Sequence, residues 1–191
     1  MKKFAAALAF VAMASSSAAM ATNLVVNGDF SSGDFSGWTQ SGDTGFTFVG
    51  NDLVNGVATM NATVGPVGDT GSLSQALATV AGQAYTISFE WAADGGDNTS
   101  FLQAVFGNHS VFNTTSTSQG WTLATVSGVA TSSSTLLQFN YRNDPSYYHF
   151  TDVSVSAVPE PESYALLGLG LTGLLLVRRR KSAASASTAA A

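Results

Sequence analysis

The chain of 191 residues contains no cysteine, which excludes disulfides, thiolate metal sites and cysteine nucleophiles. Its central part, residues 22–158, also lacks lysine and holds ten acidic residues against one base, Arg142, for a net charge of −9. Phosphate backbones repel a body this acidic, which argues against nucleic-acid binding. A domain without disulfides depends on its hydrophobic core or on a bound ion, and about 137 residues are enough to bury a core.

The N-terminal segment has the three parts of a secretory signal peptide. Met1–Lys2–Lys3 is positively charged, residues 4–14 are apolar, and Ala19–Met20–Ala21 places small residues at the positions that a signal peptidase reads. The pattern predicts a signal peptide over residues 1–21, cleaved between Ala21 and Thr22. An N-terminal membrane anchor is less favoured, because the apolar run is short and three serines follow it.

The C-terminal segment also has three parts. Pro159, Glu160 and Pro161 form a stiff acidic stretch that excludes regular helix or strand. Residues 164–177 are apolar and compatible with a helix, which would reach about 21 Å across a hydrocarbon core of about 30 Å. A basic cluster then follows, formed by Arg178, Arg179, Arg180 and Lys181. Basic residues stay in the cytoplasm, so we expect a marginal transmembrane helix with the body of the protein outside.

This three-part end, residues 158–181, resembles the PEP-CTERM sorting signal of Gram-negative bacteria. The resemblance rests on Pro159–Glu160–Pro161, the apolar run 164–177 and the basic cluster 178–181. It implies a transient inner-membrane intermediate, cleavage near the prolines by an exosortase, and delivery to the cell surface or the exopolysaccharide matrix. One departure is the low-complexity tail 182–191, since proteins of this kind usually stop soon after the basic cluster.

The body alternates between apolar and polar residues with a period of two. Tyr85, Ile87, Phe89 and Trp91 share one face, and turn residues separate this run from similar ones every 8–15 residues. The pattern predicts an all-β domain over residues 22–157, an antiparallel β-sandwich. The expected strands lie at 24–26, 46–49, 57–60, 73–80, 85–91, 102–106, 111–112, 121–125, 137–141 and 148–155.

Two segments make the fold prediction more specific. Residues 23–30 with 35–38, and residues 142–155, resemble the opening and the closing strand of carbohydrate-binding-module-like jelly rolls of the galactose-binding type. The resemblance implies that the first and last strands lie close together. It also implies a structural calcium ion between them, with Gly28, Asp29 and Asp152 as candidate ligands.

The calcium site has an alternative reading. Ser31 and Thr151 stand where the family has carboxylates, and Asp152 could instead accept hydrogen bonds from the backbone or from Arg142. The acidic loop 94–98 lacks the spacing of an EF-hand and is expected to be a solvated turn.

Aromatic, amide and guanidinium side chains can bind sugars. The candidate glycan contacts are Trp91, Gln103, Asn108, Arg142, Tyr147 and Tyr148. Trp91 is more simply a core residue, and Arg142 could pair with Asp144 or Asp152. Tyr147 and Tyr148 are adjacent, so in an extended segment they point to opposite faces.

Catalytic signals are weak. Only His109 and His149 could act as a base near neutral pH, and no nucleophile elbow, zinc-binding HExxH or phosphate-binding loop is present. We therefore expect a protein that is not an enzyme: a structural or adhesive component of the cell surface or of the exopolysaccharide matrix of a biofilm. The alternative is a carbohydrate-binding module with a defined glycan ligand, and a remote one is a hydrolase of matrix polysaccharide. The expected partners are signal peptidase, exosortase, the inner membrane and exopolysaccharide.

Overall fold

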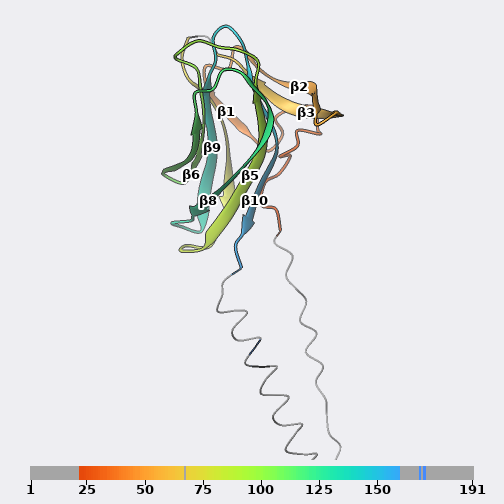
Figure 1. Cartoon of the computed structure of the whole chain (residues 1–191). Coiled ribbons are helices and arrows are strands. Elements are labelled where there is room, and N and C mark those ends of the chain that lie inside the picture. The colour runs from red at the N-terminus through yellow and green to blue at the C-terminus, as the bar shows by residue number, and fades with distance from the viewer. Residues whose placement is uncertain (1–21, 67, 160–167, 169, 171–191) are drawn as a thin grey trace, which may run out of the picture.

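The computed structural model describes residues 22–66 and 68–159, with residues 168 and 170, and forms two five-stranded antiparallel sheets packed face to face (Figure 1). Sheet A has the order β1 (Thr39–Gly42), β4 (Gly71–Ala78), β9 (Ser134–Arg142), β6 (Phe101–Phe106) and β7 (His109–Thr114). Sheet B has the order β2 (Thr47–Val54), β3 (Val57–Val64), β10 (Tyr148–Ala157), β5 (Ala84–Ala93) and β8 (Gln119–Val129). The all-β sandwich predicted from the sequence is confirmed.

The period-two alternation places the core between the sheets. Tyr85, Ile87, Phe89 and Trp91 are all buried along β5, as the sequence predicts. Burying these side chains against sheet A removes apolar surface from water, at about 25 cal/mol per Å². The alternating residues of each strand therefore point outward and form the two outer faces of the sandwich.

One predicted strand is absent, and one strand was not predicted. Residues 24–26 form no strand, although the Leu24 amide donates a hydrogen bond of 2.8 Å to the Val155 carbonyl. Strand β1 has no apolar residue and is exposed throughout, so no hydrophobic pattern predicted it. Trp121, in the predicted strand 121–125, is half-buried, and Ala124 is the buried residue of β8.

The first and last segments of the described chain lie side by side, as the family resemblance implied. The Val153 amide donates to the Gly28 carbonyl at 3.0 Å, and the Val155 amide donates to Asn23 Oδ1 at 3.0 Å. Between Thr151 and Ser154 a bulge interrupts the pairing of β10 with β5. Asp152 lies in this bulge with a φ of +52°, so its side chain leaves the regular alternation.

The signal peptide 1–21 and most of the sorting segment lie outside the described residues. Of the predicted sorting residues only Pro159 is described; Glu160, Pro161, the apolar run 164–177 and the basic cluster 178–181 are not, apart from Gly168 and Gly170. Within the described part of the chain, no helix is long and apolar enough to cross a bilayer.

Candidate functional site

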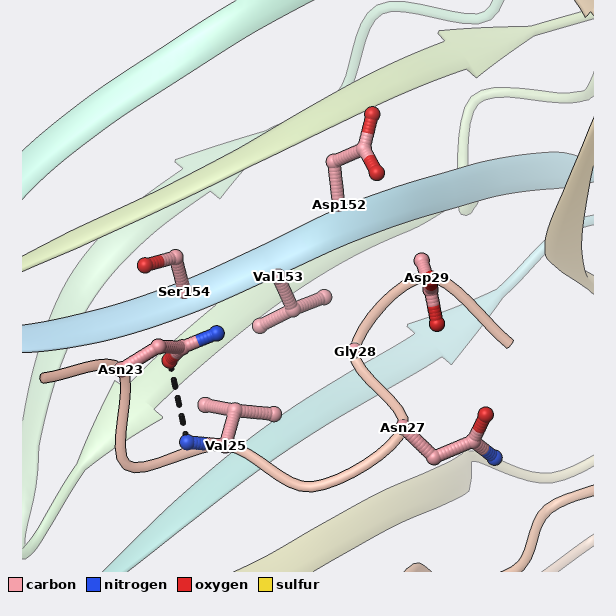
Figure 2. A pocket seen from close by; sticks show the side chains of 8 residues that line it. All are labelled: Asn23, Val25, Asn27, Gly28, Asp29, Asp152, Val153 and Ser154. Carbon is pink, nitrogen blue, oxygen red and sulfur yellow. Dashed lines mark hydrogen bonds between the residues drawn. The ribbon is translucent and has the colours of Figure 1, made fainter. Parts of the chain in front are cut away.

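A pocket of about 390 Å³ lies where the first segment meets β10 (Figure 2). It brings together the three predicted calcium residues, Gly28, Asp29 and Asp152. The other residues that line it are Asn23, Val25, Asn27, Val153 and Ser154. The structure thus brings these three residues to one location.

The geometry of this pocket does not fit a calcium ion. Ca²⁺ takes six to eight oxygen ligands, whereas the carboxylates of Asp29 and Asp152 point in different directions (Figure 2). Asp29 Oδ1 already accepts hydrogen bonds from the Ser31 amide and hydroxyl, at 3.2 and 3.0 Å. Among the described residues no group of three or more His, Cys, Asp or Glu could hold a metal. Bound calcium is therefore a prediction that rests on the resemblance alone.

The outer face of sheet A carries a row of uncharged polar side chains. Gln103 of β6 lies directly opposite Asn140 of β9 and Asn113 of β7, and Asn140 lies opposite Ser72 of β4. Ser72 in turn lies opposite Ser41 of β1, so the row crosses all five strands. These residues point outward because their neighbours along the strands, such as Phe139 and Tyr141, are buried.

Hydrogen bonds hold these amides in place. Asn140 Nδ2 donates to Gln103 Oε1 at 3.0 Å, and Gln138 Nε2 donates to Asn140 Oδ1 at 2.5 Å. We call the outer surface formed by Gln103, Asn113, Gln138 and Asn140 the amide face. Gln103, Gln138 and Asn140 are linked by these bonds, and each amide of the face can both donate and accept hydrogen bonds.

The amide face has no negative charge of its own. None of the five strands of sheet A contains Asp or Glu, although residues 22–158 hold ten of them. Arg142, the single base of the body, ends β9 on this outer side and lies opposite Phe101. The amide face therefore offers hydrogen-bonding groups with no acidic side chain among them.

The predicted glycan contacts do not form one site. Arg142 lies on the outer side of sheet A, and Asn108 is exposed in the turn between β6 and β7 at the end of the same sheet. Tyr147 is half-buried on the other side of the molecule, with its ring 5.8 Å from that of Phe48 of sheet B. As the adjacency of Tyr147 and Tyr148 predicted, one of the two rings is partly exposed and the other is buried.

Trp91 and Tyr148 belong to the core and offer no surface to a glycan. Their exposed fractions are 7% and 0%, because both occupy inward positions of central strands in sheet B. The hydroxyl of Tyr148 finds no hydrogen-bond partner among the described residues. Burial raises the pKa of Tyr148 to about 12.

Sequence reasoning overlooked Gln138, Asn140 and Asn113. The signal for Gln138 and Asn140 was present, since they alternate with the apolar residues Leu137, Phe139 and Tyr141. Their alignment with Gln103 depends on the pairing of β9 with β6, which no local pattern gives.

His149 is a structural residue. It is buried on the outer side of sheet B, and its Nε2 lies 2.9 Å from Asp94 Oδ2. Its Nδ1 lies 3.3 Å from both Asn61 Oδ1 and Thr63 Oγ1. With both ring nitrogens engaged and 6% of the residue exposed, His149 is poorly placed to act on a ligand.

The loop 94–98 is partly buried and leads into a turn in which the Ser100 amide donates to the Asp97 carbonyl at 3.2 Å. Asp97 Oδ1 accepts hydrogen bonds from the Thr99 amide at 2.8 Å and from the Thr99 hydroxyl at 2.6 Å. These bonds favour the charged carboxylate and lower the pKa of Asp97.

Comparisons with known proteins found similarities for the C-terminal sorting segment and for the β-sandwich. The family model described as "PEP-CTERM protein-sorting motif" matches residues 157–181. The enzymatically active domain of tailspike protein 4 from bacteriophage CBA120 has a similar structure, with a TM-score of 0.56, 17% identity and coverage of 71% of this chain but only 21% of that one. No match was found among curated protein sequences.

A second similar structure is TmCBM61, which was solved in complex with β-1,4-galactotriose. Its TM-score is 0.51 at 18% identity, and the match covers 72% of this chain and 99% of that one. At this identity the likeness shows the fold alone. The chain thus combines a jelly-roll body like that of carbohydrate-binding modules with a PEP-CTERM sorting motif.

Proposed function

We propose that this protein is exported, sorted by an exosortase at the inner membrane of a Gram-negative bacterium, and released to the cell surface or exopolysaccharide matrix. There it acts as a non-catalytic adhesive protein that binds polysaccharide through the amide face. The sorting motif at residues 157–181 is the observation that carries the export route. The row of ordered amides across sheet A carries the binding role.

The chemistry of the amide face matches that of a sugar chain. Hydroxyl groups both donate and accept hydrogen bonds, and so do the side chains of Gln103, Asn113 and Asn140. These three residues lie opposite one another on neighbouring strands, and strands lie about 4.8 Å apart, so the row offers contacts at regular intervals to an extended ligand. Arg142 on the same side of the sheet would add a contact for an acidic sugar.

A hydrolase has no support on this face. Glycoside hydrolysis in most families needs two carboxylates on either side of the scissile bond. The strands of sheet A supply none. The non-catalytic role is therefore the one that the residues of this face favour.

The binding proposal is tested by titrating exopolysaccharide from the host into the purified mature protein. Each lost hydrogen bond removes about 0.5–1.5 kcal/mol, so the double variant Gln103→Ala/Asn140→Ala should bind about tenfold more weakly. The matched control is Ser88→Ala/Thr125→Ala, which alters a facing pair on the outer side of sheet B. Equal affinity of wild type and the sheet A variant would show that the ligand, if bound, lies elsewhere.

The export route is tested by the intact mass of the protein from membrane and extracellular fractions of its host. Trypsin would serve poorly, because residues 22–158 contain one arginine and no lysine. In the extracellular fraction we expect the mass of a polypeptide that begins at Thr22 and ends near Pro159–Pro161. A membrane-bound form that still ends at Ala191 as the final product would contradict exosortase processing.

A further inference from the structure

The first described residues and the end of β10 lie at the same end of the sandwich. Figure 1 shows the first described residues and the end of β10 emerging there together, next to the turns that join β4 to β5 and β8 to β9. Backbone hydrogen bonds tie these turns to each other, from the Thr79 amide to the Ser133 carbonyl at 3.0 Å and from the Gly82 amide to the Ala130 carbonyl at 2.8 Å. We call this surface the exit end; it comprises residues 79–83, 107–108, 130–133 and 157–159.

The exit end contains no charged residue as far as Pro159, after which Glu160 and Glu162 follow in the sequence, whereas the opposite end is acidic. Five of the ten acids of the body lie in the loops of the opposite end, namely Asp43, Asp69, Asp94, Asp97 and Asp144. The ten residues of β5 separate the two ends by about 33 Å, at 3.3 Å per residue. That distance is about four Debye lengths at physiological ionic strength, so the two ends present separate electrostatic surfaces.

Apolar side chains project from the exit end or border it. Val80 is 65% exposed in the turn between β4 and β5, Val129 is 54% exposed at the end of β8, and Val158 is 39% exposed after β10. Single exposed valines are common on protein surfaces. Here three exposed valines lie at an uncharged end of an acidic domain. Such a surface can lie against a bilayer, which has an apolar interior and an anionic surface.

Hydrogen bonds hold the chain against the sandwich as far as Val158. The Val158 amide donates to the Ala84 carbonyl at 2.9 Å, and Gln83 Nε2 donates to the Val158 carbonyl at 2.6 Å. There is consequently no slack between the folded domain and the sorting motif. Only residues 159–163 separate Val158 from the apolar run 164–177, and five residues span at most about 17 Å.

From these observations we infer that the exit end rests on the surface of an anionic phospholipid bilayer while the apolar run anchors the chain. This inference rests on the proposed export route, in which residues 164–177 enter the membrane. Acids at the exit end would be repelled by an anionic surface within a Debye length; none of the ten acids of the body lies there, and five lie in the loops of the opposite end. Pro159 is thereby held close to the lipid surface, where the proposed export route places the cleavage.

The absence of cysteine makes a direct test simple. Full-length protein is reconstituted in vesicles of phosphatidylcholine and phosphatidylglycerol that contain a headgroup-spin-labelled lipid as quencher. Single cysteines carry a fluorophore, introduced by Val80→Cys or Val129→Cys at the exit end and by Thr115→Cys or Ser118→Cys at the opposite end. All four positions are exposed, so two independent labels report on each end. Loss of fluorescence is expected for the two exit-end labels and not for the other two.

A charge variant tests the electrostatic part. Ser132→Glu/Ser133→Glu adds two acids to the exit end and should reduce the quenching of the Val80→Cys label about twofold in anionic vesicles. The same variant should leave quenching unchanged in vesicles of phosphatidylcholine alone. The matched control, Thr115→Glu/Ser118→Glu, adds two acids to the opposite end and should have no effect in either vesicle.

The outcomes separate this inference from the proposal on which it rests. If the protein fails to float with the vesicles, membrane anchoring and the inference both fall. If it floats but the exit-end labels are quenched no more than the opposite-end labels, anchoring stands and the inference alone is overturned.

Discussion

Phe139 of sheet A stacks on Phe150 of sheet B, with ring centroids 4.4 Å apart and ring planes at 19°. Phe89 packs edge-on against Phe139 at 5.0 Å, and all three rings are fully buried. The two sheets are therefore joined by an aromatic layer in the middle of a sandwich that has no disulfide. Most of the stability of the domain should come from contacts of this kind.

We predict that Phe150→Ala lowers the free energy of unfolding by about 3–5 kcal/mol, because it leaves a cavity beside Phe139 and Phe89. The measurement is urea-induced unfolding followed by tryptophan fluorescence. The control is Val129→Ala, whose side chain is exposed and whose change should stay within about 0.5 kcal/mol. A loss below about 1 kcal/mol for Phe150→Ala would contradict the central role of this layer.

The hydroxyl of Tyr148 gives a prediction of the opposite sign. It is buried without a partner in the part of the chain that the structure describes. Tyr148→Phe removes this unsatisfied group while it keeps the ring, so it should stabilise the protein by about 1 kcal/mol at neutral pH. Urea unfolding measures the change, and the control is Tyr141→Phe, which removes a hydroxyl that is bonded to Thr47 Oγ1 at 3.4 Å. Destabilisation by Tyr148→Phe would indicate an unrecognised partner for the hydroxyl.

The same two tyrosines predict the alkaline limit of stability. Burial raises the pKa of Tyr141 and of Tyr148 to about 12, so the folded protein holds both phenolic protons more tightly than the unfolded chain does. Stability should therefore be complete below the unfolded pKa of about 10 and fall as pH rises from about 10 to 12. Each tyrosine should contribute up to about 2 kcal/mol of this loss. Unfolding measured across this range should show a shallower decline in either Phe variant; an unchanged decline in both would contradict the assignment.

Sequence reasoning succeeded where one residue and its neighbours decide the structure. The alternation of apolar and polar residues from Tyr85 to Trp91 predicted β5. The adjacency of Tyr147 and Tyr148 predicted that their side chains point to opposite faces. It failed for β1, which is held in sheet A by backbone pairing with β4 and has no apolar residue. Such a strand has no hydrophobic signal because none of its side chains is buried.

The candidate site divides in the same way. Gly28, Asp29 and Asp152 were placed together through resemblance, since local pattern alone gives no contact between residues so far apart in sequence. The amide face could not be predicted, because it depends on the order of strands in sheet A and on their register. A period-two pattern shows that Asn140 points outward, but only the pairing of β9 with β6 shows that it faces Gln103.

The contact between Gly28 and β10 predicts a position where no side chain is tolerated. A Cβ atom on Gly28 would overlap with the carbonyl oxygen of Val153, which is backbone and cannot move aside alone. Gly28→Ala should therefore cost about 2–4 kcal/mol of stability and expose the Val153 amide to hydrogen exchange. The control is Gly120→Ala, since an added Cβ there meets open space. Equal stability of the two variants would show that the first segment can leave β10 without loss.

Calcium provides the last prediction, because the resemblance and the geometry disagree about it. A structural ion at a hundred times its Kd would add about 2.7 kcal/mol of stability, which for a domain of this size raises the Tm by several degrees. The carboxylates of Asp29 and Asp152 point in different directions, and Asp29 is already bonded to Ser31. We therefore expect the Tm measured with excess EDTA to agree within about 1 °C with the Tm measured in millimolar calcium chloride. If calcium instead raises the Tm, the variant Asp152→Asn tests whether the ion binds in this pocket. Loss of the rise in this variant would show that the pocket rearranges around a calcium ion, as the resemblance implied.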